Sequence, residues 1–103
     1  MCDWQERVAT FVDTHGLTVS PSVRLLDLSS EVGELAKVYL TATEYTVGPM
    51  PPSANWEEEL GDVLFALLCL AHSTGVDMDA ALTRVLNKYA QRLSHRSSPA
   101  SGR

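Results

Sequence analysis

The sequence predicts an all-α fold of four helices, and three observations support this prediction. Apolar residues recur at helical spacing in four separate stretches of the 103-residue chain. Glycine, proline and capping residues stand between these stretches, where helices would begin and end. No stretch shows the alternation of apolar and polar residues that is typical of a half-buried strand.

The first two helices are separated by a glycine and a Ser-Pro pair. We expect the first helix over residues 4–15, because Gly16 suits the left-handed position that follows a helix. Ser20 is the expected N-cap of the second helix, with Pro21 at its first position. Its apolar series continues to about Tyr45, so the second helix is expected to be long.

Residues 46–55 form the only substantial internal loop that we expect. This segment contains Gly48 and several prolines, which interrupt regular structure, and it is the place where a lid could lie. Ser53 or Asn55 is the expected cap of the third helix, which Gly75 should end.

The fourth helix completes a single domain over residues 1–95. Asp77 is its expected cap, and its apolar stripe ends near Ser94. The remaining residues 96–103 are rich in serine and have no apolar side chains to bury, so we expect a disordered tail.

The third helix also predicts assembly. Its residues from Val63 to Ala71 are all apolar, and a helix without a polar face needs cover on every side. Three short helices can hardly provide that cover in so small a chain. We therefore expect a bundle completed by dimerisation, as a homodimer or a dimer of dimers.

Composition limits the environment and the partners. A formal net charge of −5 argues against direct binding of nucleic acid or of an anionic membrane. Cys2 and Cys69 do not form a disulfide framework, and Asp3 and Glu6 stand where a signal peptide would be basic. The apolar run of the third helix is too short to span a bilayer. These features indicate a cytoplasmic protein that is not inserted in a membrane.

Four carboxylates continue the apolar stripes of the second and third helices. Glu31 and Glu34 lie on the core face of the second helix, and Glu59 and Asp62 on that of the third. Buried carboxylates are normally paired with a cation. Clustered acids without histidine or cysteine suit Mg²⁺, or Mn²⁺, better than zinc or copper, so the sequence predicts a site for phosphoryl or nucleotidyl transfer.

Other side chains could contact a substrate of this kind. Lys88 and Arg92 stand four residues apart on the fourth helix and could bind phosphate groups. Trp56 abuts the acidic face and could stack on a base, although an aromatic residue that anchors the core is the simpler interpretation.

The acidic pattern resembles that of a known family. Glu31-Val-Gly-Glu34-Leu followed by Glu58-Glu59-Leu-Gly-Asp62-Val-Leu-Phe is similar to the signature of the MazG-like all-α nucleoside triphosphate pyrophosphohydrolases, and the resemblance extends from Pro21 through Asn87-Lys88-Tyr89 to Arg92. It implies Mg²⁺-dependent hydrolysis of a (deoxy)nucleoside triphosphate to the monophosphate and pyrophosphate, of a house-cleaning type. It further implies that the four acids are catalytic metal ligands and that Lys88, Arg92 and the neighbouring Asn87 contact the substrate.

One position differs from the family signature and keeps alternatives open. Ser30 stands where the family usually has a glutamate, which leaves the general base unassigned; Asp27, one turn from Glu31, could take that role. A phosphoribosyl-ATP pyrophosphohydrolase would show a similar acidic pattern. A catalytically silent protein that binds nucleotide and metal is the alternative from another class.

Overall fold

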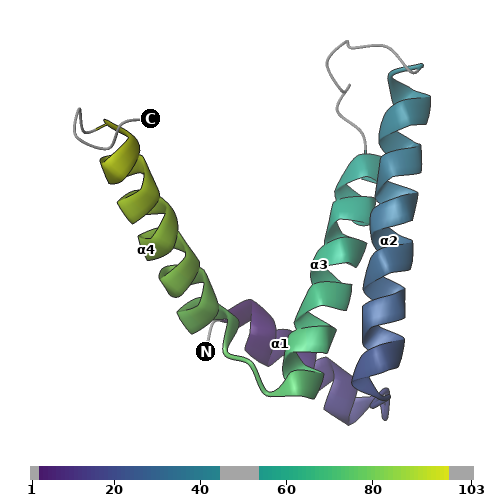
Figure 1. Cartoon of the computed structure of the whole chain (residues 1–103). Coiled ribbons are helices and arrows are strands. Elements are labelled where there is room, and N and C mark those ends of the chain that lie inside the picture. The colour runs from purple at the N-terminus through teal and green to yellow at the C-terminus, as the bar shows by residue number, and fades with distance from the viewer. Residues whose placement is uncertain (1–2, 45–53, 98–103) are drawn as a thin grey trace.

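The computed structural model describes residues 3–44 and 54–97, and this part of the chain is entirely helical apart from short connections (Figure 1). The elements are four α-helices: α1 (Asp3–Thr14), α2 (Pro21–Ala42), α3 (Ala54–Thr74) and α4 (Met78–Ser97). The predicted all-α class is confirmed. The expected loop and lid at 46–55 lie mostly outside the described residues.

The two glycines that were expected to end helices do so by the expected mechanism. Gly16 has φ 64° and Gly75 has φ 70°, a left-handed conformation that glycine adopts without a steric penalty. The residue after each glycine donates a backbone hydrogen bond to the last turn of the helix. Leu17 N donates to Val12 O and Val76 N donates to Ala71 O, each over 3.0 Å.

Helix α2 begins at Pro21, as predicted, and ends slightly earlier than expected. Ser20 is the N-cap residue, but its Oγ lies 3.0 Å from Ser22 Oγ and forms no side-chain cap bond. The helix ends at Ala42 rather than near Tyr45. Thr43 Oγ1 donates to Tyr39 O over 2.9 Å, and Glu44 adopts φ 52°, so the chain leaves the helical path at that point.

The ends of α3 and α4 also refine the sequence-based boundaries. Asn55 lies inside α3, so it is not the cap, and Ser53 is outside the described residues. Asp77 Oδ1 accepts hydrogen bonds from Asp79 N (3.0 Å) and Ala80 N (3.3 Å), as expected of an N-cap. The Ala80 N–H makes the largest contribution to lowering the pKa of this carboxyl. Helix α4 continues to Ser97, past the expected end, and residues 98–103 are not described.

The four described helices do not close a bundle with one another. Helices α2 and α3 form an antiparallel pair, α1 crosses their lower end, and α4 diverges from them (Figure 1). The buried apolar residues come from α1 and α3: Val12, Ala66, Leu68, Cys69 and Ala71. Within the described residues no single helix is long and apolar enough to span a membrane; only Asn55–Thr74 and Met78–Arg96 taken together, bent by 104°, meet the criteria of length and composition.

A buried glutamine fixes the junction between α3 and α4. The side chain of Gln5 is almost fully buried, with 1% exposure. Its Nε2 donates to Val76 O, and its Oε1 accepts from Met78 N over 2.9 Å. Gln5 thereby satisfies two backbone groups at the start of α4 and holds α1 against this turn.

Replacing Gln5 with leucine should destabilise the fold through these two bonds. Gln5→Leu keeps a side chain of similar size but leaves a backbone carbonyl and an N–H without their partner, which should lower the free energy of unfolding by about 2–4 kcal/mol. Gln91→Leu is the matched control, because Gln91 is exposed on α4. Urea denaturation of both variants measures the effect; equal losses would show that the buried amide is not responsible.

Candidate metal centre

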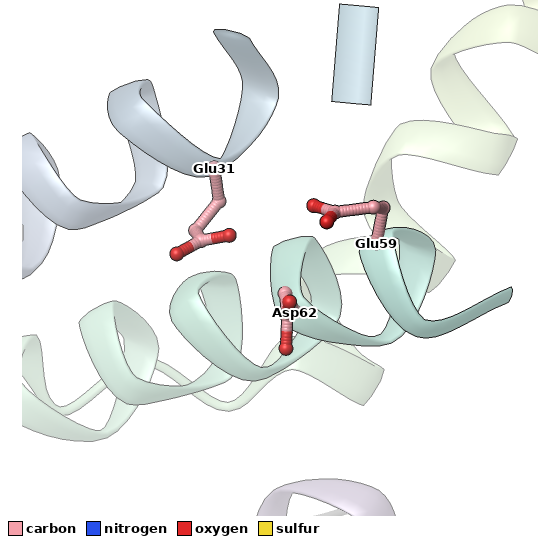
Figure 2. Close-up of side chains that lie close together, drawn as sticks. All are labelled: Glu31, Glu59 and Asp62. Atoms are coloured by element: carbon pink, nitrogen blue, oxygen red, sulfur yellow. The ribbon is translucent and has the colours of Figure 1, made fainter. Parts of the chain in front are cut away.

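Three carboxylates from two helices converge between α2 and α3. Glu31 extends from α2 toward Glu59 and Asp62 on α3 (Figure 2). One oxygen from each of the three groups lies within 4.8 Å of the others. The structure thus brings together three of the four predicted acids; Glu34 is not part of this group, which we call the acid cluster.

The acid cluster follows from helical periodicity and the antiparallel pairing. Glu59 and Asp62 are three residues apart, so they lie on neighbouring positions of one face of α3. That face continues into Val63 and buried Ala66. Glu31 lies on the half-buried side of α2 that packs on α3. The packing of the two apolar stripes therefore carries the acids to one point.

Electrostatics make the acid cluster unfavourable without a cation. The pKa of the Glu59 carboxyl is raised, first by desolvation and then by the negative charges of Asp62, Glu31, Glu34 and Glu58. The charges that act on Glu59 within the described residues are all carboxylates. A bound cation would remove this repulsion and return the pKa toward low values.

The donor set fits a small divalent ion. Carboxylate oxygens are the ligands that Mg²⁺ and Mn²⁺ prefer, and oxygens already within 4.8 Å of one another can contract onto an ion whose ligands lie at about 2.1 Å. Glu31 and Glu59 are half-buried while Asp62 is exposed. The site therefore has an open side on which water or phosphate oxygens could complete the coordination shell.

Glu34 and Trp56 lie on the far side of the acid cluster from α1. Glu34 lines a 390 Å³ cavity together with Lys37 and Asn55, and its charge still reaches Glu59. The Trp56 ring packs on Tyr39, with centroids 5.8 Å apart and planes at 55°. This contact joins α2 to α3, which matches the simpler of the two interpretations of Trp56; a role in stacking on a base stays a prediction.

The predicted phosphate-binding residues lie on α4, which diverges from the helices that carry the acids (Figure 1). Lys88 Nζ is 5.1 Å and Arg92 Cζ 5.6 Å from the centre of the Tyr89 ring, so both cations flank one aromatic side chain. Asn87, Lys88 and Arg92 are all exposed. Within the described part of one chain, the structure does not bring them to the acid cluster.

One residue beside the acid cluster was not singled out by sequence reasoning. Arg24 lines a 260 Å³ pocket with Asp27, and Glu31 and Asp62 form part of the same wall. Its position seven residues before Glu31 places it on the same face of α2, two turns away. That spacing was the available signal, but an arginine at such a position usually remains on the surface.

Comparison with known proteins identifies the family. The model of the MazG nucleotide pyrophosphohydrolase domain matches residues 20–97, which include the acid cluster and α4. The chain belongs to this family. It is 37% identical over 78 residues to the uncharacterized protein YpjD of Bacillus subtilis (strain 168), covering 71% of this chain and 67% of that protein. It is 38% identical over 76 residues to mouse dCTP pyrophosphatase 1, covering 70% of this chain but only 45% of the mouse protein. No solved structure matches the chain.

Metal binding should stabilise this MazG domain in a pH-dependent way. Saturating Mg²⁺ or Mn²⁺ should raise the Tm near neutral pH, because the ion binds only the folded acid cluster. The raised pKa of Glu59 means that the metal-free protein loses stability as the pH rises through that pKa, so chelation should cost most above it. As the pH falls through this pKa, protonation of Glu59 removes the negative charge that the cation would otherwise neutralise. The difference in Tm between the metal-bound and the metal-free protein should therefore shrink.

Thermal melts with chelator and with metal across this pH range measure both effects. A Tm that is the same with chelator and with saturating metal at neutral pH would contradict the assignment of the acid cluster as a metal centre.

Proposed function

We propose that this MazG-family chain is a Mg²⁺-dependent nucleoside triphosphate pyrophosphohydrolase of a house-cleaning type, which converts a (deoxy)nucleoside triphosphate to the monophosphate and pyrophosphate. The observation that carries the proposal is the acid cluster, which lies on two helices within the residues that match the family. The likeness to mouse dCTP pyrophosphatase 1 supports a nucleotide substrate. The proposal places the protein in the cytoplasm, where a free, buried thiol such as that of Cys69 would stay reduced.

Each acid has a distinct place in this proposal. Glu31, Glu59 and Asp62 hold the ion from two sides, and Glu34 adds negative charge nearby. A bound Mg²⁺ neutralises polyphosphate charge and lowers the pKa of water. The packed α2–α3 pair brings the three carboxylates together before substrate arrives, so little reorganisation is needed during reaction.

The phosphate contacts in this proposal come from a second subunit. A polyphosphate needs cations in addition to the metal, and Lys88 and Arg92 lie on the diverging helix α4. A homodimer in which α4 of one chain packs beside α2 and α3 of the other would bring both cations, with Asn87, to the acid cluster. A dimer of dimers would allow the same arrangement.

Exposed apolar surface supports this assembly. Leu82, Leu86 and Leu93 on α4 are 55%, 57% and 62% exposed. A 480 Å³ groove between α1 and α3 is lined mainly by apolar side chains, namely Trp4, Arg7, Val8, Phe11, Gly61, Leu64, Phe65 and Leu68. Apolar surface of this extent is typical of an interface rather than of a monomer in water.

Two alternatives to this function are distinguished by which nucleotides, if any, the protein hydrolyses. Phosphoribosyl-ATP hydrolysis would require the same acid cluster, and a silent nucleotide-binding protein would retain metal affinity without turnover. Ser30 is exposed on α2, next to Glu31, and gives the silent alternative its support because serine does not replace a glutamate base. Release of pyrophosphate from a panel of nucleotides with Mg²⁺ tests all three functions.

Removing a ligand of the acid cluster should abolish turnover without unfolding the protein. Glu59→Gln or Asp62→Asn keeps the side-chain shape but deletes a charge, so pyrophosphate release should fall by at least about 100-fold, as expected when several kcal/mol of metal-based stabilisation are lost. The metal-free Glu59→Gln protein should melt at a higher temperature than wild type, because repulsion is reduced. Glu57→Gln is the control, since Glu57 is exposed on α3. Similar losses at Glu57 and Glu59 would refute the assignment.

Subunit mixing tests the origin of the cations. Glu59→Gln and Lys88→Ala should each be inactive as homodimers. A heterodimer of the two has one site with both residues intact if Lys88 acts on the partner's acid cluster, so an equimolar mixture after subunit exchange should recover about a quarter of the wild-type activity. Sedimentation should show no monomer at micromolar concentration. A monomer, or a mixture without activity, would contradict the proposed assembly.

A further inference from the structure

A pocket continues from the acid cluster along the groove between α2 and α3. It has a volume of about 260 Å³ and includes two members of the acid cluster in its wall. Its lining consists of Arg24, Asp27, Glu31, Asp62, Phe65 and Ala66. A ligand bound to the metal centre through phosphate groups could therefore extend into this pocket without crossing a barrier.

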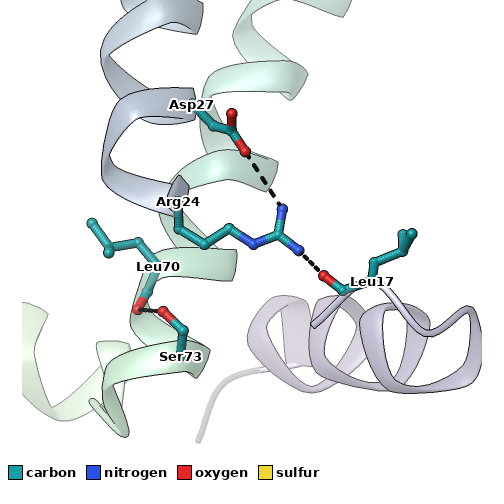
Figure 3. Close-up of polar contacts among 5 residues, drawn as sticks. All are labelled: Leu17, Arg24, Asp27, Leu70 and Ser73. Carbon is teal, nitrogen blue, oxygen red and sulfur yellow. Dashed lines mark hydrogen bonds and ion pairs between the residues drawn. The ribbon is translucent and has the colours of Figure 1, made fainter. Parts of the chain in front are cut away.

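The polar end of the pocket is held in a fixed arrangement. Arg24 Nη2 donates to Leu17 O, and Arg24 Nη1 lies 3.8 Å from Asp27 Oδ2 (Figure 3). The Arg24 side chain is only 11% exposed, whereas that of Asp27 is 51% exposed. A guanidinium has five N–H donors, so Arg24 can keep both contacts and still donate to a ligand.

The charges of this pocket suit a neutral polar group better than a polyphosphate. Arg24 and Asp27 carry opposite charges and face each other, so the pair offers a donor beside an acceptor with little net charge. A polyphosphate would be repelled by Asp27 and by the acids at the mouth of the pocket. The edge of a nucleobase, by contrast, presents donors and acceptors side by side.

An aromatic side chain and the length of the groove fit the same ligand. Phe65 lines the pocket, and its ring is supported by Phe11, with centroids 6.1 Å apart and planes at 85°. Asp27 and Arg24 lie one and two turns from Glu31, about 6 and 10 Å along the helix axis. A sugar and base extend over a comparable length from the α-phosphate.

We propose that this pocket receives the nucleobase of the substrate and that Arg24 and Asp27 select a base with an exocyclic amino group beside a ring nitrogen, as in cytosine or adenine. Asp27 accepts from the amino group, Arg24 donates to the ring nitrogen, and Phe65 contacts the ring face. The inference rests on the proposed function, because it places the phosphates at the metal centre.

Selection between bases arises because the wrong base leaves a polar group of the pocket without a hydrogen-bond partner. Uracil and hypoxanthine carry a carbonyl where cytosine and adenine carry the amino group, so the Asp27 carboxylate would face another acceptor. Such a mismatch leaves a charged acceptor without a donor, which is the kind of contact that gives enzymes strong discrimination. Because Asp27 is half exposed, water can relieve part of the mismatch, and we expect discrimination of at least about 10-fold.

Matched nucleotide pairs test the inference. The ratio of kcat/KM for dCTP over dUTP, or for dATP over dITP, should favour the amino-bearing member in wild type at saturating Mg²⁺. Asp27→Asn converts an acceptor into a group that can also donate, so it should lower this ratio by about 10-fold while the protein stays folded. Glu57→Gln should leave the ratio unchanged.

Three results would overturn the inference. These are a wild type that does not favour the amino-bearing member, a ratio that Asp27→Asn leaves unchanged without lowering activity, and a ratio left unchanged because kcat/KM falls equally for every nucleotide in Asp27→Asn. The last result would assign Asp27 to the general base instead of the base pocket.

Product binding separates failure of the pocket from failure of the proposed function. If wild type hydrolyses no nucleotide, the function is wrong, but calorimetry at saturating Mg²⁺ still measures whether dCMP or dAMP binds more tightly than dUMP or dIMP. A preference that Asp27→Asn removes would support the pocket. Equal affinities, or no binding at millimolar nucleotide, would overturn it.

Discussion

The constraint that the rest of the structure must satisfy is the repulsion between three carboxylates at the contact of α2 and α3. Apolar packing brings Glu31, Glu59 and Asp62 together, and desolvation and the neighbouring charges raise the pKa of Glu59. Such an arrangement is unfavourable in isolation and becomes favourable when a divalent ion occupies it. In the proposed function, stability and activity are coupled, because an ion that supports hydrolysis would also relieve the repulsion in the metal-free fold.

In the proposed function, a single chain provides only part of the site. The α2–α3 pair supplies carboxylates and a pocket with one paired arginine, whereas Lys88 and Arg92 lie on α4. The buried amide of Gln5 holds the start of α4 in a direction that leads away from the pair. The exposed leucines of α4 and the apolar groove beside α1 are explained together if another copy covers them.

Sequence reasoning succeeded where local chemistry decides the structure. Gly16, Gly75 and Asp77 end or begin helices through their own conformational and hydrogen-bonding properties, and periodicity placed Glu59 and Asp62 on one face. It was less accurate where distant residues decide. In the sequence, Gln5 looks like an ordinary surface residue. Only tertiary packing places it beside Val76 and Met78. The position of Arg24 beside the acid cluster and the exclusion of Glu34 from it likewise depend on the register of α2 against α3. The direction of α4 depends on the turn at Gly75.

The most direct test of the central claim is the position of a bound ion. A crystal structure of the full chain soaked or grown with Mn²⁺, measured at a wavelength where manganese scatters anomalously, should show the ion between Glu31, Glu59 and Asp62, with carboxylate oxygens at about 2.1 Å. The same measurement on Glu59→Gln should show a weaker peak or none. A fully occupied ion elsewhere, with the three carboxylates still facing one another without it, would contradict the account.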